Sequence, residues 1–229
     1  MNPHCMEYLT YMDLDGRIIE SYTTGFLDVS YMGLTELPPL PSKLQKLICS
    51  KNSLTSLPML PPNLVELYCA QNHLTTIDAL PSTLTVLSCW GNDLVSLPEL
   101  PPNLVGLDCY FNNLPTLPKF PDTLTWIYCG YNRLRTLREP SPNLQTYICF
   151  GNPLTKDFHA CIGSVSDMTV RNIRQYYRLR RLAKDCVHTV CANLDLSKDV
   201  LAKVCSYLSG IDDSLSNQIA ILKEAYRAD

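Results

Sequence analysis

The sequence lacks the features that mark membrane and exported proteins. It has no run of about twenty apolar residues, the length that a membrane-spanning helix needs. Its N-terminus, MNPHCMEYLTYMDLDGRII, has no basic start followed by an apolar stretch, so we expect no signal peptide and no membrane partner. Eleven cysteines, an odd number, then favour reduced thiols over a disulfide framework. We therefore expect an intracellular protein.

Motifs that carry enzyme chemistry are also missing. The sequence has no glycine-rich phosphate loop, no GxSxG turn and no HExxH helix. Its four histidines, His4, His73, His159 and His188, stand apart from any grouping of a carboxylate with a nucleophile. We therefore predict that the protein is not an enzyme and uses no cofactor.

The C-terminal part contains one group of residue types that bind zinc. The group comprises His159, Cys161, Cys186, His188 and Cys191. On an ideal helix, Cys186 and Cys191 would point about 140° apart, so they would not share one ligand sphere. The sequence favours no metal site over a zinc site here.

Charge is too evenly balanced to indicate a nucleic-acid partner. The chain has 19 Lys and Arg against 22 Asp and Glu, a net charge of −3. Stacking of bases on aromatic side chains would need basic residues among the aromatics. Only Lys46 and Lys51 lie in that part of the pattern, so nucleic-acid binding is disfavoured.

The sequence does contain an internal repeat with a period of twenty residues, LxxLxCxxNxLxxLPxLPxx. The recurring cysteines and asparagines are Cys49, Cys69, Cys89, Cys109, Cys129 and Cys149, and Asn52, Asn72, Asn92, Asn112, Asn132 and Asn152. An earlier degenerate copy, FLDVSYMGLTELPPLP, has Val29 and Met32 in these two positions. The pattern predicts about seven turns.

This pattern resembles leucine-rich repeats over roughly residues 24–154. Its LPxLPxxLxxL half is similar to the repeats of secreted bacterial effectors, and the cysteine is similar to that of repeat proteins in giant DNA viruses. The resemblance implies an α/β leucine-rich-repeat solenoid, with short parallel strands on the concave face and an extended proline-rich convex side. A viral source would place the protein in the host cytoplasm or the virion.

Strand geometry assigns the repeated cysteine to the interior. Successive side chains of a strand point to opposite faces, so Leu67 and Cys69 point inward while Glu66, Tyr68 and Ala70 point outward. Free cysteine behaves as a small buried hydrophobe, so we predict a structural row of thiols. Disulfides between turns and a thiolate metal site are the alternatives. Both are disfavoured because they need side chains that point toward one another, whereas stacked side chains point the same way.

The outward strand positions carry many aromatic residues, which we predict to form a surface that binds a protein or peptide. These residues are Tyr68, Trp90, Tyr110, Phe111, Trp126, Tyr128, Tyr131 and Phe150. Two alternatives stay open: the rings support one another along the sheet, or the C-terminal segment covers them. A structural, self-associating role, for example in a virion, is a third hypothesis, and the sequence leaves the oligomeric state unknown.

Both ends of a solenoid need covers. We predict an N-terminal cap over residues 1–23, a β-hairpin turning at Asp15 and Gly16, and a helical C-terminal cap over residues 155–229. In that cap Ile173 fits a helix's apolar face, while a second face carries Arg171, Arg174, Arg178 and Arg181. A solvated face is the simplest interpretation of these arginines, and an acidic partner or a membrane surface is the alternative.

Residues 196–208, LSKDVLAKVCSYL, resemble the start of an F-box. An F-box docks on the Skp-type adaptor of cullin ubiquitin ligases, so the resemblance implies that adaptor as a partner. Ser197 stands where the family usually has proline. The alternative is an ordinary amphipathic helix that covers the end of the solenoid.

Overall fold

The computed structural model describes residues 14, 16–154, 170–174, 177–178 and 181. The chain divides into two units, Met1–Leu154 and Thr155–Asp229, and each is treated by itself below.

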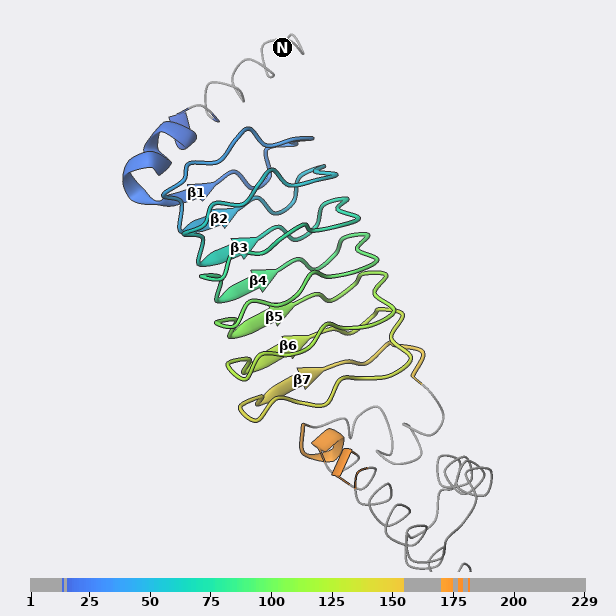
Figure 1. The fold of residues 1–229 in the computed structure, drawn as a ribbon. Helices are drawn as coiled ribbons and strands as arrows, with labels where there is room; N and C mark the ends of the chain where they lie inside the picture. Colours follow the sequence, from blue (N-terminus) through green and yellow to red (C-terminus); the bar gives the residue numbers. More distant parts are fainter. Residues whose placement is uncertain (1–13, 15, 155–169, 175–176, 179–180, 182–229) are drawn as a thin grey trace, which may run out of the picture. The chain divides into compact units, whose positions relative to one another are not determined.

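Seven short parallel strands stack in sequence order in the first unit (Figure 1). They are β1 (Phe26–Asp28), β2 (Lys46–Ile48), β3 (Glu66–Tyr68), β4 (Val86–Ser88), β5 (Gly106–Asp108), β6 (Trp126–Tyr128) and β7 (Thr146–Ile148). Every strand pairs with the next at an offset of twenty residues, as in the register Leu47 to Leu67. This solenoid confirms the predicted parallel sheet and its period.

The interior is built from the leucines and cysteines of the repeat. The middle residue of each strand is buried, and so is the cysteine two positions later, as Leu67 and Cys69 show at 0% exposure. Val29 fills the same interior position in the first turn. Burying a leucine side chain contributes about 1.5–3 kcal/mol, so the stacked rows supply most of the stability.

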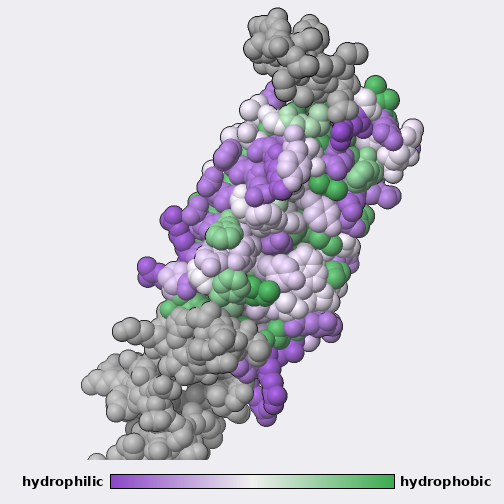
Figure 2. Space-filling model, turned by 180° about the vertical axis from the view of Figure 1, so that it is seen from behind, coloured by the Kyte–Doolittle hydropathy of each residue, from purple (hydrophilic) through white to green (hydrophobic). Residues whose placement is uncertain are grey.

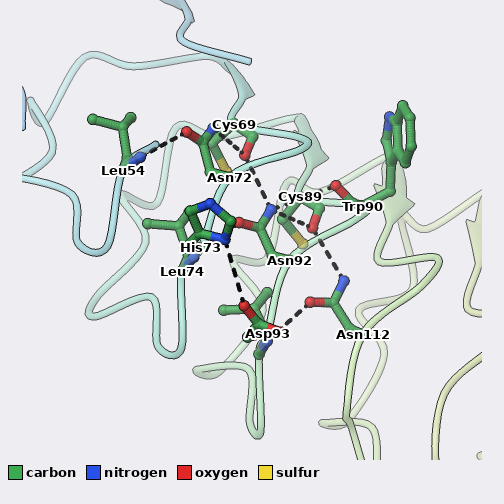
Figure 3. Close-up of polar contacts among 11 residues, drawn as sticks. Leu54, Cys69, Asn72, His73, Leu74, Cys89, Trp90, Asn92, Asp93 and Asn112 are labelled. Carbon is green, nitrogen blue, oxygen red and sulfur yellow. Dashed lines mark hydrogen bonds and ion pairs between the residues drawn. The ribbon is translucent and has the colours of Figure 1, made fainter. Parts of the chain in front are cut away.

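An asparagine in each turn satisfies the backbone where the strand ends (Figure 3). The Asn72 side chain accepts a bond from the Leu54 N–H at 3.0 Å and donates to the carbonyl oxygens of Cys49 and Cys69 at 3.0 and 3.1 Å. The same bonds recur one turn later at Asn92. Each asparagine therefore closes its strand, because its side-chain amide both donates and accepts hydrogen bonds.

A second polar row joins the turns on the other side of each coil. Asn63 donates to the Ser42 carbonyl at 3.2 Å, and one turn later Thr83 donates to the Pro62 carbonyl at 2.8 Å. Asn103, Thr123 and Asn143 continue the row. Neither row uses the outward side chains of the strands.

The predicted N-terminal hairpin is wrong, because residues 16–24 form a helix. Leu14 and Ser21 are buried at helical spacing, and Gly25, at φ +70°, donates to the Ser21 carbonyl at 3.0 Å. A glycine in the left-handed region is a common helix end. The hairpin prediction took Asp15 and Gly16 as a turn, whereas the chain turns at Gly25.

Residues 170–174, 177–178 and 181 are helical, as predicted from their spacing. Ile173 is buried, and all four arginines of the predicted basic face are exposed. No helix among the described residues is long and apolar enough to span a membrane. The F-box-like segment 196–208 and the zinc-type group between His159 and Cys191 lie outside the described residues.

Candidate partner-binding face

The outward side chains of the seven strands form one surface, here called the outer sheet face. It comprises the first and third residue of each strand and the two residues that follow each inward cysteine, or Val29 in the first turn. All eight aromatic residues predicted to bind a partner lie on it. On the side of the molecule drawn in Figure 2, hydrophobic residues form small groups among hydrophilic ones rather than one continuous area.

Four rings from the last three turns form one group, here called the rim cluster: Tyr110, Phe111, Tyr131 and Phe150. Phe111 and Tyr131 stack with ring centroids 4.5 Å apart and an interplanar angle of 14°. Tyr110 meets both of them edge to face, at 4.7 and 5.3 Å. Phe150 packs against Tyr110 at 5.6 Å and Tyr131 at 5.4 Å. The rings therefore hold one another in fixed orientations.

The rim cluster nevertheless stays in contact with solvent. Phe111 is 50% exposed and Tyr131 45%. Both residues also have left-handed backbone, each with φ +50°, a conformation that bulky side chains rarely adopt. Two other turns place glycine at the same position, Gly91 and Gly151. The molecule thus carries exposed rings at positions where glycine would be the least strained residue.

A second pair of rings lies on strand β6. The Trp126 and Tyr128 centroids are 5.2 Å apart. Trp126 extends across the preceding strand and lies against Gly106, where a Cβ would come 2.0 Å from the ring carbon Cζ2. Tyr110 covers Gly130 in the same way, with its Cε2 2.5 Å from the position of a Cβ. Glycines on the outer sheet face thus make room for the rings.

One carboxylate lies among these rings. Asp108 of β5 is in register with Ser88 on one side and Tyr128 on the other. Its Oδ1 accepts a bond from the Tyr110 backbone N–H at 3.2 Å. Burial raises the pKa of this carboxyl above its ordinary value, and that one hydrogen bond opposes the shift.

Tyr68 belongs to a separate polar group two turns earlier. The Glu66 carboxylate lies 2.8 Å from the Lys46 ammonium and accepts a bond from the Tyr68 hydroxyl at 3.1 Å. The hydrogen bond with Glu66 raises the pKa of Lys46, and the same bond lowers the pKa of Glu66. Lys46 also sits 5.2 Å from the centroid of the Tyr68 ring. This ammonium is thus already held by Glu66.

The structure therefore brings six of the eight predicted rings into two groups and leaves two apart. Trp90 points away from the row of asparagines (Figure 3). The sequence pattern puts Asp108, Gly106 and Gly130 in outward positions, but they were not predicted to be part of the site. A glycine beside an aromatic residue in neighbouring outward positions was the available signal.

Burial makes the repeat thiols unreactive, because it keeps them protonated. Burial raises the pKa of Cys49 to about 12 and that of Cys69 well above its ordinary value. The six repeat cysteines are buried, which agrees with their predicted structural role, and Cys49, Cys69, Cys89, Cys109 and Cys129 are free thiols. Within the described residues, no group of three metal-binding side chains occurs.

Comparisons with known proteins agree with this architecture. Residues 42–82 match the family described as Leucine Rich repeats (2 copies). The leucine-rich-repeat domain of a Shigella effector is 28% identical with a TM-score of 0.57, over 63% of this chain and 77% of that one. YopM, a leucine-rich effector protein from Yersinia pestis, is 34% identical with a TM-score of 0.60, over 62% of this chain and 42% of YopM. No curated protein matches the chain.

Proposed function

We propose that this leucine-rich-repeat protein binds a protein or peptide through the aromatic part of the outer sheet face, without catalysing a reaction. The observation that carries the proposal is the exposure of the rim cluster, in which Phe111 and Tyr131 have left-handed backbone. Backbone strain of about 1–3 kcal/mol per residue persists where the surrounding structure enforces it, and it concentrates at binding sites. Solenoids use such extended faces for partner recognition.

The chemistry of the face fits a macromolecular partner better than a small molecule. Tyrosine and tryptophan combine a large apolar ring with a hydrogen-bonding group, and they carry much of the binding energy at protein interfaces. The rings already hold one another, so little side-chain freedom is lost when a partner covers them. From the sequence alone, packing of the rings along the sheet was an alternative to partner binding. The fixed rings instead support the proposal that this face binds a partner.

The test is affinity capture from a eukaryotic cell lysate, with identification by mass spectrometry. The full chain is compared with Trp90→Ala/Tyr110→Ala/Trp126→Ala. A matched control, Tyr22→Ala/Met59→Ala/Val95→Ala, removes three exposed apolar side chains that lie off the rim cluster. A partner that binds the wild type and the control but not the aromatic variant supports the proposal. Equal capture by all three chains overturns it.

The two other hypotheses from the sequence predict different results. A Skp-type adaptor captured by the wild type and by the aromatic variant would add a role for residues 196–208. A structural, self-associating role predicts a mass that rises with protein concentration, which light scattering measures on the purified chain.

A further inference from the structure

Asp108 is an acidic residue of the outer sheet face that lies in register with the aromatic residue Tyr128. It is half-buried, and its side chain accepts a single hydrogen bond, from the Tyr110 N–H at 3.2 Å. Within the part of the chain that the structure describes, no lysine, arginine or histidine pairs with it. A carboxylate shielded from water without a cationic partner costs free energy, as its raised pKa also indicates.

Other residues of the outer sheet face do not supply a cation that pairs with Asp108. The Lys46 ammonium lies on β2, three strands away, and is held by Glu66 at 2.8 Å. The direct register partners of Asp108 are Ser88 and Tyr128, and neither carries positive charge. Asp108 therefore differs from Glu66, which has its cation within the same molecule.

Aromatic rings occupy the positions around Asp108. Trp126 lies against Gly106, which precedes Asp108 by two residues on the same side of β5, and the ring centroids of Trp126 and Tyr128 are 5.2 Å apart. Tyr110 follows Asp108 by two residues, and the charge of Asp108 contributes to raising the pKa of its hydroxyl, after burial and Tyr131. The face of an aromatic ring attracts a cation, and most strongly where water is excluded.

A metal ion does not fit this site. Calcium takes about six to eight oxygen ligands and magnesium about six, whereas Asp108 offers one carboxylate beside rings that are poor ligands. A guanidinium group fits better because its flat surface stacks on an indole or phenol ring while its N–H groups bond to a carboxylate.

We propose that Asp108, together with Trp126, Tyr128 and Tyr110, receives an arginine side chain from the bound protein or peptide. This inference rests on the proposed function and specifies the chemistry of its partner. The guanidinium stacks on the ring of Trp126 and pairs with the carboxylate, so the partner itself supplies the missing cation. Partners without a cationic side chain at this place are rejected, because they would leave a carboxylate buried and unpaired.

The test is selection from a library of random peptides displayed on phage, carried out with the full chain. We expect the selected peptides to share an arginine. Replacing that arginine with citrulline, its neutral analogue, should weaken binding of the synthetic peptide by about tenfold or more. Asp108→Asn should weaken binding of the arginine peptide by a similar factor and leave binding of the citrulline peptide unchanged.

Glu66→Gln is the matched control, since it neutralises a carboxylate on the same face that already has a cation. It should bind the arginine peptide as the wild type does. Selected peptides that need the aromatic rings but carry no cationic residue, and that bind Asp108→Asn equally well, would overturn this inference and leave the proposed function standing. Failure to select any peptide, or equal binding to the aromatic triple variant, would overturn both.

Discussion

The Trp126 indole lies against the backbone of Gly106, so that a Cβ at Gly106 would come 2.0 Å from its ring carbon Cζ2. Such a distance is far below van der Waals contact. The conformation of Trp126 therefore depends on the absence of a side chain one turn earlier.

Gly106→Ala should displace the Trp126 ring and destabilise the solenoid by about 1–3 kcal/mol, the usual cost of overpacking. Denaturant unfolding measures the free energy, and near-ultraviolet circular dichroism reports the moved ring. Gly16→Ala is the control, because nothing lies within 4 Å of a Cβ there and the residue is helical, so it should not destabilise the protein. Equal effects of the two substitutions would contradict the contact.

Asn92→Ala should destabilise the protein by about 2–5 kcal/mol, since it leaves the buried Leu74 N–H without its acceptor and removes two further hydrogen bonds. Those two bonds run to the carbonyl oxygens of Cys69 and Cys89, which keep their bonds from Asn72 and Asn112. Thermal unfolding of the purified wild type and variants measures this loss of stability. Asn103→Ala, which removes one exposed bond of 3.1 Å to Ser82, should cost less than about 1 kcal/mol.

The buried thiols should make stability depend on alkaline pH. Burial raises the pKa of Cys49 from 9.0 to about 12, so the folded state keeps its proton where the unfolded state loses it. The stability contributed by this group is complete below pH 9.0 and falls as the pH rises toward about 12. Unfolding measured across this window should show the decline.

Replacing the inner thiols provides the control for that pH dependence. Valine suits the position, because Val29 is fully buried in the equivalent place of the first turn. Cys69→Val/Cys89→Val/Cys109→Val should therefore show a shallower alkaline decline than the wild type. An unchanged slope would mean that the repeat thiols do not cause it.

Phe111→Gly should separate binding from folding. The substitution loses a ring stack worth about 0.5–1.5 kcal/mol but relieves a left-handed residue that costs about 1–2 kcal/mol. We expect stability to stay within about 1 kcal/mol of the wild type while the captured partner is lost. Lys51→Gly makes the same backbone change at φ +58° outside the rim cluster and should retain the partner.

Periodicity made the interior predictable, whereas the details of the outer face were not. Because the chain repeats every twenty residues, the inward direction of Cys69 followed from strand geometry alone. The same alternation put Trp126 and Asp108 on the outward side. It could not show that Trp126 bends over Gly106, because side-chain rotamers depend on neighbours in three dimensions.

Two further features escaped prediction for local reasons. The left-handed backbone at Phe111 is imposed by hydrogen bonds to the adjacent turn, and nothing in an aromatic side chain signals it. At the N-terminus, alternating apolar residues around Asp15 and Gly16 led to the prediction of a hairpin. The structure has a helix over residues 16–24, which ends where Gly25 donates to the Ser21 carbonyl. The helix end depends on the position of β1, which begins at the next residue.

The asparagine bonds also bear on how such a chain can change its length. Each asparagine joins its own turn to the one before, and every strand pairs at an offset of twenty residues. Duplicating or deleting a block of that length would recreate the same bonds at the new junction, whereas any other length would break them. The solenoid can therefore gain or lose whole turns, and each turn added between Lys46 and Asp108 would place them one strand further apart.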